Sequence, residues 1–157
     1  MLKPNFIFNS FLDITPEFLR DNNIKALLLD VDNTLTYAHK TKKLRDGAEK
    51  WFSLMRENDI SLIVLSNAKP KRARAFGESI GLAALGGAAK PLPFGYLRAK
   101  RRLGLKSSEI AMVGDQLFTD IYGGNRMGLT TFLVTPIKND ETKFIVFKRK
   151  IEKMVLK

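Results

Sequence analysis

Short apolar runs alternate along the chain with segments of helical periodicity. The runs at residues 25–31, 61–65, 110–113 and 130–134 are largely apolar, and polar or turn-forming residues follow each of them. This pattern is typical of parallel strands that are covered on both faces, and residues 82–85 predict a further, short edge strand. Because a helical segment lies between successive runs, we predict an α/β fold with a mainly parallel sheet of about five strands.

The intervening segments carry helix signals. Thr15 is a typical cap for a short helix whose first residue is Pro16, and the polar residues at 115–120 lead into another helix. The glycine-rich segment 86–91 predicts a flexible loop. Apolar residues at helical spacing predict three longer helices, at residues 46–58, 70–80 and 93–103.

Both ends of the chain leave two interpretations open. The N-terminal arm and helix, residues 1–24, are rich in aromatic residues, which we expect to cover one side of the core; the alternative is contact with lipid or a partner. Residues 138–157 predict a final helix with seven basic and three acidic residues. We favour a helix packed on the core with a solvated basic face over one lying on an anionic bilayer.

Composition narrows the class of protein. The chain has 157 residues, of which 45% are hydrophobic and 27% charged, so we expect a single globular domain, residues 1–157. Cysteine is absent, which excludes disulfides, zinc–thiolate sites and a cysteine nucleophile. No signal peptide or membrane-length apolar stretch is recognisable, so we predict a cytoplasmic location, including peripheral attachment to the inner face of the membrane.

The charge balance predicts an anionic partner. The formal net charge is +11, which attracts nucleic acid, an acidic membrane surface or a phosphorylated substrate.

The most informative polar residues directly follow the first long apolar run. Asp30 and Asp32 lie on the same side of an extended chain because side chains alternate with period two. Two like charges about 4–6 Å apart repel by a few kcal/mol at an effective dielectric of about 20, so a proton, a basic side chain or a divalent cation must compensate them. An all-oxygen ligand set favours Mg²⁺. Alone, such a pair is as often a turn or a helix cap.

Three features later in the sequence favour a functional role for Asp30 and Asp32 over a turn or a helix cap. Ser66 and Asn67 follow the next strand, Lys90 lies in the glycine-rich loop, and Asp115 and Asp120 follow the fourth strand. Open α/β sheets bind their ligands at the carboxyl ends of the strands. Considered alone, Lys90 would be interpreted as a surface lysine and Asp120 as a helix cap. The presence of all these residues in order along the chain argues against both interpretations. The single histidine, His39, is not assigned a role.

The ordered set resembles the four motifs of the haloacid dehalogenase (HAD) superfamily of phosphohydrolases. The motifs are Asp30-Val31-Asp32-Asn33-Thr34-Leu35, Ser66-Asn67, Lys90-Pro91, and Gly114-Asp115 with Asp120. The chain is more closely similar to the YqeG family of HAD type IIIA phosphatases, which is related to phosphatidylglycerophosphatases of mitochondria and plastids. The resemblance implies a HAD-like Rossmannoid three-layer sandwich and hydrolysis of phosphatidylglycerophosphate to phosphatidylglycerol.

The resemblance also implies roles for individual residues. Asp30 is expected to attack phosphorus, Asp32 to act as general acid and base, Ser66 to bind the phosphoryl oxygens and Lys90 to screen charge. Mg²⁺ is expected on Asp30, Asp115, Asp120 and, through its backbone carbonyl, Asp32. The remaining substrate-binding residues of the prediction are Asn33, Thr34, Asn67 and Arg72.

Spacing limits the size of the domain and bears on the substrate. The gap between the first two motifs has room for one helix and one strand, and the next gap for little more than a helix and its turns, so we predict a capless enzyme. An open site accepts a headgroup on a large body, such as an anionic lipid at a membrane, and a capless enzyme can also close its site as a homo-oligomer. Alternatives are a phosphatase of soluble or macromolecular phosphates, a basic nucleic-acid or ribonucleoprotein binder on the same scaffold, and, less compatible with the motif order, a phosphoacceptor receiver domain.

Overall fold

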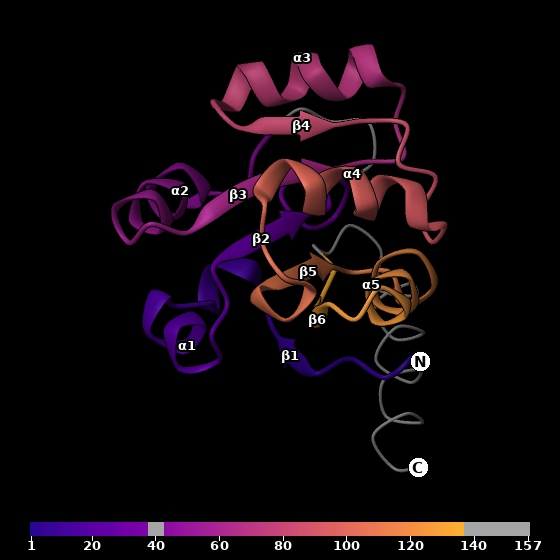
Figure 1. Ribbon diagram of the computed structural model, residues 1–157. Helices are drawn as coiled ribbons and strands as arrows, with labels where there is room; N and C mark the ends of the chain where they lie inside the picture. Colours follow the sequence, from indigo (N-terminus) through magenta and orange to yellow (C-terminus); the bar gives the residue numbers. More distant parts are fainter. Residues whose placement is uncertain (38–42, 137–157) are drawn as a thin grey trace.

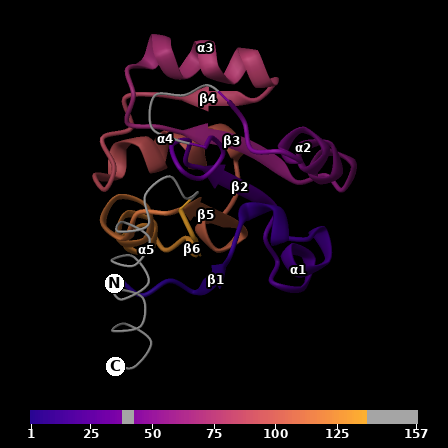
Figure 2. The same ribbon diagram turned by 180° about the vertical axis from the view of Figure 1, so that it is seen from behind.

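A six-stranded, all-parallel sheet with the order β1-β6-β5-β2-β3-β4 forms the centre of the molecule. The computed structural model describes residues 1–37 and 43–136; the predicted tail helix and His39 lie outside the described residues. The strands are β1 (Phe6–Phe8), β2 (Ala26–Leu29), β3 (Ser61–Leu65), β4 (Ala83–Leu85), β5 (Ile110–Gly114) and β6 (Thr130–Val134). Figures 1 and 2 show β4 at one edge beside α3, and β1 at the other edge.

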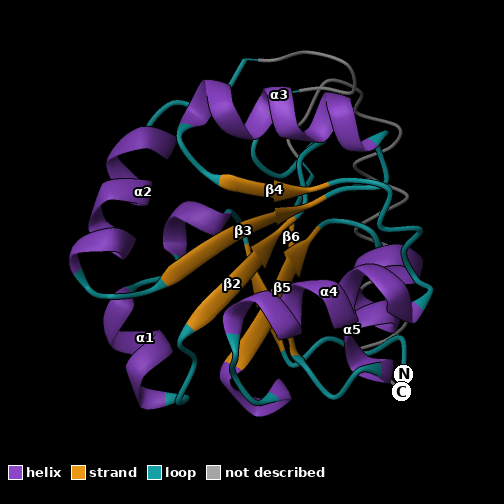
Figure 3. Cartoon of the chain, turned by 45° about the horizontal axis from the view of Figure 1, so that its top comes forward, coloured by secondary structure: helices purple, strands orange, loops and turns teal. Residues whose placement is uncertain are grey.

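Helices cover both faces of the sheet (Figure 3). The α-helices are α1 (Pro16–Asp21), α2 (Ala48–Glu57), α3 (Pro70–Ile80), α4 (Pro93–Leu103) and α5 (Gly123–Arg126). Short 3-10 turns lie at Phe11–Asp13 and Ser107–Glu109, and a π-helical turn, η3, spans Leu117–Tyr122. Within the described residues, no helix has the length and apolar character needed to cross a bilayer.

Strand β2 supplies both hydrophobic cores because its side chains alternate between the faces of the sheet. Leu27 and Leu29 pack in the core that α1, α2 and α3 cover, whereas Ala26 and Leu28 pack in the core beneath α4. All four residues of β2 are buried. The structure therefore has the predicted three layers.

The N-terminal strand is the main difference from the sequence prediction. Phe6 and Phe8 do cover the core, since their rings contact Phe18 and Phe132 with centroids 4.9–5.7 Å apart. They do so from a sixth strand, which pairs in parallel with β6. A three-residue strand is too short to produce a clear alternation pattern, so the sequence predicts only about five strands.

Strand register brings the expected site residues to one edge. Leu29 of β2 lies level with Val64 of β3 on one side and Val113 of β5 on the other. Because the three strands are parallel, their carboxyl ends meet at the same edge of the sheet. The chain leaves β2 at Asp30 and β5 at Asp115, so these two carboxylates emerge side by side.

Candidate active site

Three carboxylates meet at the carboxyl edge of the sheet. The Asp30 backbone N–H donates to the carbonyl of Val113 at 3.0 Å, which continues the pairing of β2 with β5 past the end of the strand. One carboxylate oxygen each from Asp30, Asp115 and Asp120 lies within 4.8 Å of the other two. The structure thus brings together residues that are separated by up to 90 positions in the sequence.

Lys90 is the cation of this cluster. Its Nζ donates to Oδ1 of Asp30 at 3.0 Å and to Oδ1 of Asp120 at 2.8 Å, and its side chain is 2% exposed. Burial alone lowers the pKa of Lys90, but the charges of Asp120 and Asp30 outweigh it and raise that pKa well above its ordinary value. The ammonium therefore stays charged and offsets part of the repulsion between the carboxylates.

Asn67 holds the backbone of Lys90 from the neighbouring strand end. Its Oδ1 accepts from the Lys90 N–H at 2.7 Å, and its Nδ2 donates to the Lys90 carbonyl at 3.2 Å. Because both ends of the amide are engaged in this clamp, the structure favours a positioning role for Asn67 over the substrate contact expected from the sequence. Asn67 and Lys90 are 23 positions apart, so no local sequence pattern indicates the hydrogen bond between them.

The glycine-rich segment before Lys90 is packed and hydrogen-bonded, and its flexibility stays a prediction. The N–H of Ala88 donates to the Ser66 carbonyl at 3.0 Å, and the N–H of Gly87 donates to the Ala68 carbonyl at 2.6 Å. Ala88 is fully buried against Gly95 of α4, where an added Cβ would lie 2.6 Å from the Ala88 Cβ. Gly95 thus allows α4 to pack closely on this segment.

The π-helical turn fixes Asp120. The N–H of Gln116 donates to Oδ2 of Asp120 at 3.2 Å, so the two oxygens of this buried carboxylate face Gln116 and Lys90 respectively. The Tyr96 hydroxyl of α4 donates to the Thr119 carbonyl at 2.6 Å. A π-turn inside a helix frequently marks a functional site. The sequence prediction missed Tyr96, because an aromatic residue at helical spacing is typical of a core position.

The chemistry of the cluster fits a divalent cation. Oδ1 of Asp115 is buried and has no hydrogen-bond partner among the described residues, and a divalent cation would provide this oxygen with a partner. Burial, followed by the charges of Asp30 and Asp120, raises the pKa of Asp115 well above its ordinary range. Burial and the charge of Asp30 raise the pKa of Asp120 to about 6, although Lys90 opposes them. Burial is the largest cause of both shifts and the neighbouring carboxylates add to it; Mg²⁺ with its oxygen ligands would neutralise that negative charge.

The turn after Asp30 is tightly wound. The Val31 carbonyl accepts from the backbone N–H groups of Thr34, Leu35 and Thr36 at 2.9–3.2 Å. Asn33 has φ +61°, a left-handed conformation that asparagine tolerates better than most residues. Thr34 is 1% exposed, which favours a structural role in the turn over the predicted substrate contact. Asp32 is half-buried in this turn and is outside the side-chain carboxylate group.

The two other predicted substrate contacts lie on neighbouring elements. Ser66 follows β3, and its Oγ accepts from the Ala68 N–H at 3.0 Å. Arg72 is exposed on α3, which begins four residues after Ser66. Their roles toward a substrate stay predictions.

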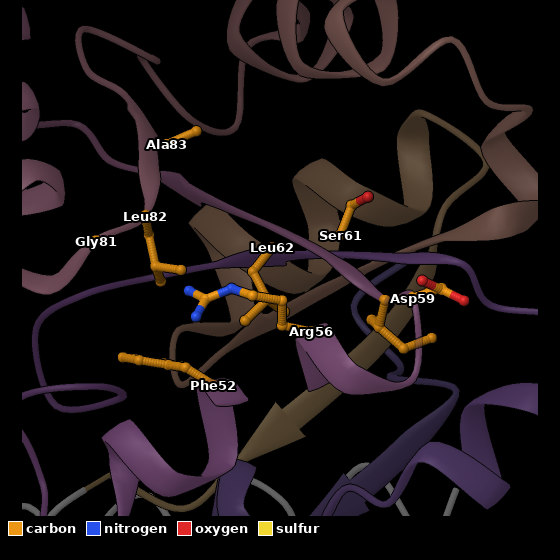
Figure 4. A pocket seen from close by; sticks show the side chains of 9 residues that line it. Phe52, Arg56, Asp59, Ser61, Leu62, Gly81, Leu82 and Ala83 are labelled. Atoms are coloured by element: carbon orange, nitrogen blue, oxygen red, sulfur yellow. The ribbon is translucent and has the colours of Figure 1, made fainter. Parts of the chain in front are cut away.

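The hollow of about 410 Å³ in Figure 4 is a different feature. It lies between α2, β3 and β4 and is lined by Phe52, Arg56, Asp59, Leu62 and Leu82, among others. Ser61 and Ala83, the first residues of β3 and β4, also line it. The hollow is therefore at the amino edge of the sheet, opposite the carboxylates, and has no part in the candidate site.

Comparison with known proteins decides the family. The sequence profile of the haloacid dehalogenase-like hydrolases matches residues 37–128. "Probable phosphatase YqeG" of Bacillus subtilis is 35% identical over 99% of this chain and 92% of that protein, so this likeness also includes Asp30 and the turn after it. The chain belongs to the haloacid dehalogenase-like hydrolases. It is a HAD phosphatase.

Two further relatives of this HAD phosphatase have names that state a substrate. The chloroplastic/mitochondrial phosphatidylglycerophosphate phosphatase 1 of Arabidopsis thaliana is 33% identical over 90% of this chain and 43% of that protein. The mitochondrial phosphatidylglycerophosphatase of Saccharomyces cerevisiae is 28% identical over 82% of this chain and 75% of that protein.

A solved structure agrees with the fold of the HAD phosphatase. The 4-nitrophenylphosphatase of Thermotoga maritima superposes with a TM-score of 0.62, covering 77% of this chain and 90% of that chain at 12% identity. At this identity the likeness concerns the fold alone. Between Asp30 and Lys90, the described part of the HAD phosphatase contains α2, β3, α3 and β4 and no inserted domain.

Proposed function

We propose that this HAD phosphatase is a Mg²⁺-dependent phosphomonoester hydrolase that works through an aspartyl-phosphate on Asp30. The observation that carries the proposal is the Asp30 carboxylate at the open edge of the sheet, held 3.0 Å from the Lys90 ammonium and beside Asp115 and Asp120. A carboxylate in such a setting is oriented by fixed partners and is a competent nucleophile.

In the first half of the reaction, a carboxylate oxygen of Asp30 attacks phosphorus. A new P–O bond forms to Asp30, and the P–O bond to the leaving alcohol breaks. Asp32 donates its proton to the departing oxygen, so the alcohol leaves neutral. The Ser66 hydroxyl donates to a phosphoryl oxygen while its oxygen accepts from Ala68, and Lys90 balances charge on the transferring group.

In the second half, Asp32 acts as a base. It takes a proton from a water molecule, whose oxygen attacks phosphorus and breaks the P–O bond to Asp30. Inorganic phosphate leaves, Asp30 is restored as a carboxylate and Asp32 as an acid, so the cycle closes. Asp32 lies two residues beyond Asp30 in the turn built on the Val31 carbonyl, and this closeness along the chain supports the assignment.

Magnesium belongs to the proposal as the partner of the carboxylates. Asp30 and Asp115, with the backbone carbonyl of Asp32, would hold the ion, and Asp120 would support it from its position beside Lys90. When bound, Mg²⁺ supplies charge neutralisation that lets an anionic nucleophile approach an anionic phosphate.

We propose phosphatidylglycerophosphate as the substrate and an anionic membrane surface as the place of reaction. The names of the two eukaryotic relatives support this choice. The absence of an inserted domain between Asp30 and Lys90 in the described chain leaves room for a headgroup that is still anchored in a bilayer. The net charge of +11 favours such a surface. Closure of the site by a homo-oligomer stays a prediction.

A substrate panel tests the proposal. Phosphate release is measured on phosphatidylglycerophosphate in detergent micelles, glycerol 3-phosphate, a sugar phosphate and a nucleoside monophosphate, each with Mg²⁺ and with EDTA. We expect the lipid to be preferred and EDTA to abolish turnover. Asp30→Asn should lower kcat by about a thousandfold or more, whereas the matched control Asp59→Asn, at the opposite edge of the sheet, should retain it. A clear preference for soluble compounds would refute the lipid substrate while leaving the chemistry intact.

A further inference from the structure

Three large apolar side chains are exposed around the candidate active site. Phe94 is 64% exposed, Phe118 is 61% exposed and Leu92 is 48% exposed. We call these three residues the apolar rim. Exposed phenylalanines at this level are unusual for a soluble surface, and they mark a contact site when they gather in one place.

Chain connectivity places the apolar rim next to the catalytic cluster. Leu92 follows Lys90 by two residues, and Phe118 lies between Asp115 and Asp120. Phe94 is on the first turn of α4 and follows Lys90 by four residues. The hydrogen bond from Tyr96 to the Thr119 carbonyl joins the start of α4 to the turn that carries Phe118. The rim therefore comes from two adjoining segments that also supply catalytic groups.

Neighbouring residues make the rim amphipathic. Phe118 stacks on Tyr122 with centroids 5.6 Å apart, and the Arg126 guanidinium lies 5.5 Å from the Tyr122 ring. On α4, Arg101 is exposed one turn beyond Leu97, which is itself 43% exposed. Three exposed cations, Lys69, Lys71 and Arg72, stand at the start of α3 where the chain leaves β3.

We propose that the apolar rim inserts into the headgroup region of an anionic bilayer and so presents the catalytic edge to its lipid; this inference rests on the proposed function. Aromatic side chains beside cations are the combination that binds the interface of an anionic membrane. A second copy of the chain is a less favourable partner for the apolar rim than a bilayer, because two molecules that each carry a net charge of +11 repel one another.

Vesicle flotation at physiological salt tests the proposal, with vesicles of phosphatidylcholine alone and of equal parts phosphatidylcholine and phosphatidylglycerol. The wild type should float with the anionic vesicles. Phe94→Ser and Phe118→Ser should each weaken binding by on the order of tenfold, whereas Leu54→Ser, a matched control 42% exposed on α2, should bind as the wild type does. Hydrolysis of 4-nitrophenyl phosphate should be unchanged in all four proteins, which also verifies folding.

A second readout uses fluorescence. Trp51 is the single tryptophan and is buried, so Phe118→Trp adds one reporter at the rim. Its emission should shift to the blue when anionic vesicles are added.

Three outcomes would overturn the proposal. They are a wild type that does not float, serine variants that float as well as the wild type, and serine variants that convert an oligomer into a monomer in sedimentation without changing flotation. In each case turnover of phosphatidylglycerophosphate in micelles still reports separately on the proposed function.

Discussion

At the scale of single residues, the site depends on how Lys90 is held. Its ammonium contacts two carboxylates, while its backbone is clamped on both sides by one amide, that of Asn67. Ala89, just before it, has φ +53°, a conformation that alanine adopts only when its surroundings impose it. The position of the cation is thus determined by hydrogen bonds and packing around residues 86–90.

Asn67→Ala tests this clamp. Loss of two hydrogen bonds to the Lys90 backbone should lower kcat by about thirtyfold, since each bond contributes about 1 kcal/mol and the two together about 2 kcal/mol. KM should change little because the proposal assigns Asn67 no contact with substrate. Steady-state kinetics on a soluble phosphomonoester distinguish the two effects.

The control for this prediction is Asn58→Ala, which removes one exposed bond to the Leu54 carbonyl at the end of α2. It should leave kcat unchanged. A rise in KM without a fall in kcat for Asn67→Ala would instead restore the substrate contact that the sequence suggested.

At the scale of elements, sequence periodicity predicted most of the fold. The structure confirms the predicted bounds of β3, α4 and β6, at residues 61–65, 93–103 and 130–134. Long apolar runs and clear helix starts can be recognised in the local sequence. The structure also confirms that Asp30 and Asp115 emerge together. The three-residue β1 and the packed segment 86–90 were not predictable, since both are defined by partners distant in sequence.

Gly95 tests the packing of α4 against the Lys90 segment. An added Cβ would lie 2.6–2.9 Å from atoms of Ala88, so Gly95→Ala should displace that segment. We expect a loss of about 1–3 kcal/mol in the free energy of unfolding together with a fall in kcat, measured by urea denaturation and phosphate release.

Gly77→Ala is the matched control for Gly95→Ala. Its Cβ would meet Leu82 and Ala84 at 2.6–2.7 Å, between α3 and β4 and away from Lys90. It should reduce stability by a similar amount and leave kcat intact. Equal losses of kcat in the two variants would show that general destabilisation, and not displacement of Lys90, explains the effect.

At the scale of the whole molecule, the carboxylate cluster links stability to metal. Three carboxylate oxygens within 4.8 Å of one another destabilise the metal-free fold, and an ion that binds only the folded state stabilises it. Mg²⁺ should therefore raise the melting temperature of the wild type. Asp115→Asn should raise the melting temperature of the metal-free protein by about 2–4 °C, equivalent to about 1 kcal/mol, and should abolish the response to Mg²⁺.

Differential scanning calorimetry in EDTA and in Mg²⁺ measures both effects. Asp59→Asn, at the opposite edge of the sheet, should behave as the wild type does. A full Mg²⁺ response in Asp115→Asn would place the ion elsewhere.

Chemical trapping during turnover identifies the residue that carries the phosphoryl group. The enzyme is quenched during turnover of a phosphomonoester in Mg²⁺ and treated with borohydride, which reduces an aspartyl-phosphate to homoserine, and the product is located by peptide mass spectrometry. We expect homoserine at position 30, and none in EDTA. Homoserine at position 32 or 115, or full turnover by Asp30→Asn, would contradict the proposed role of Asp30.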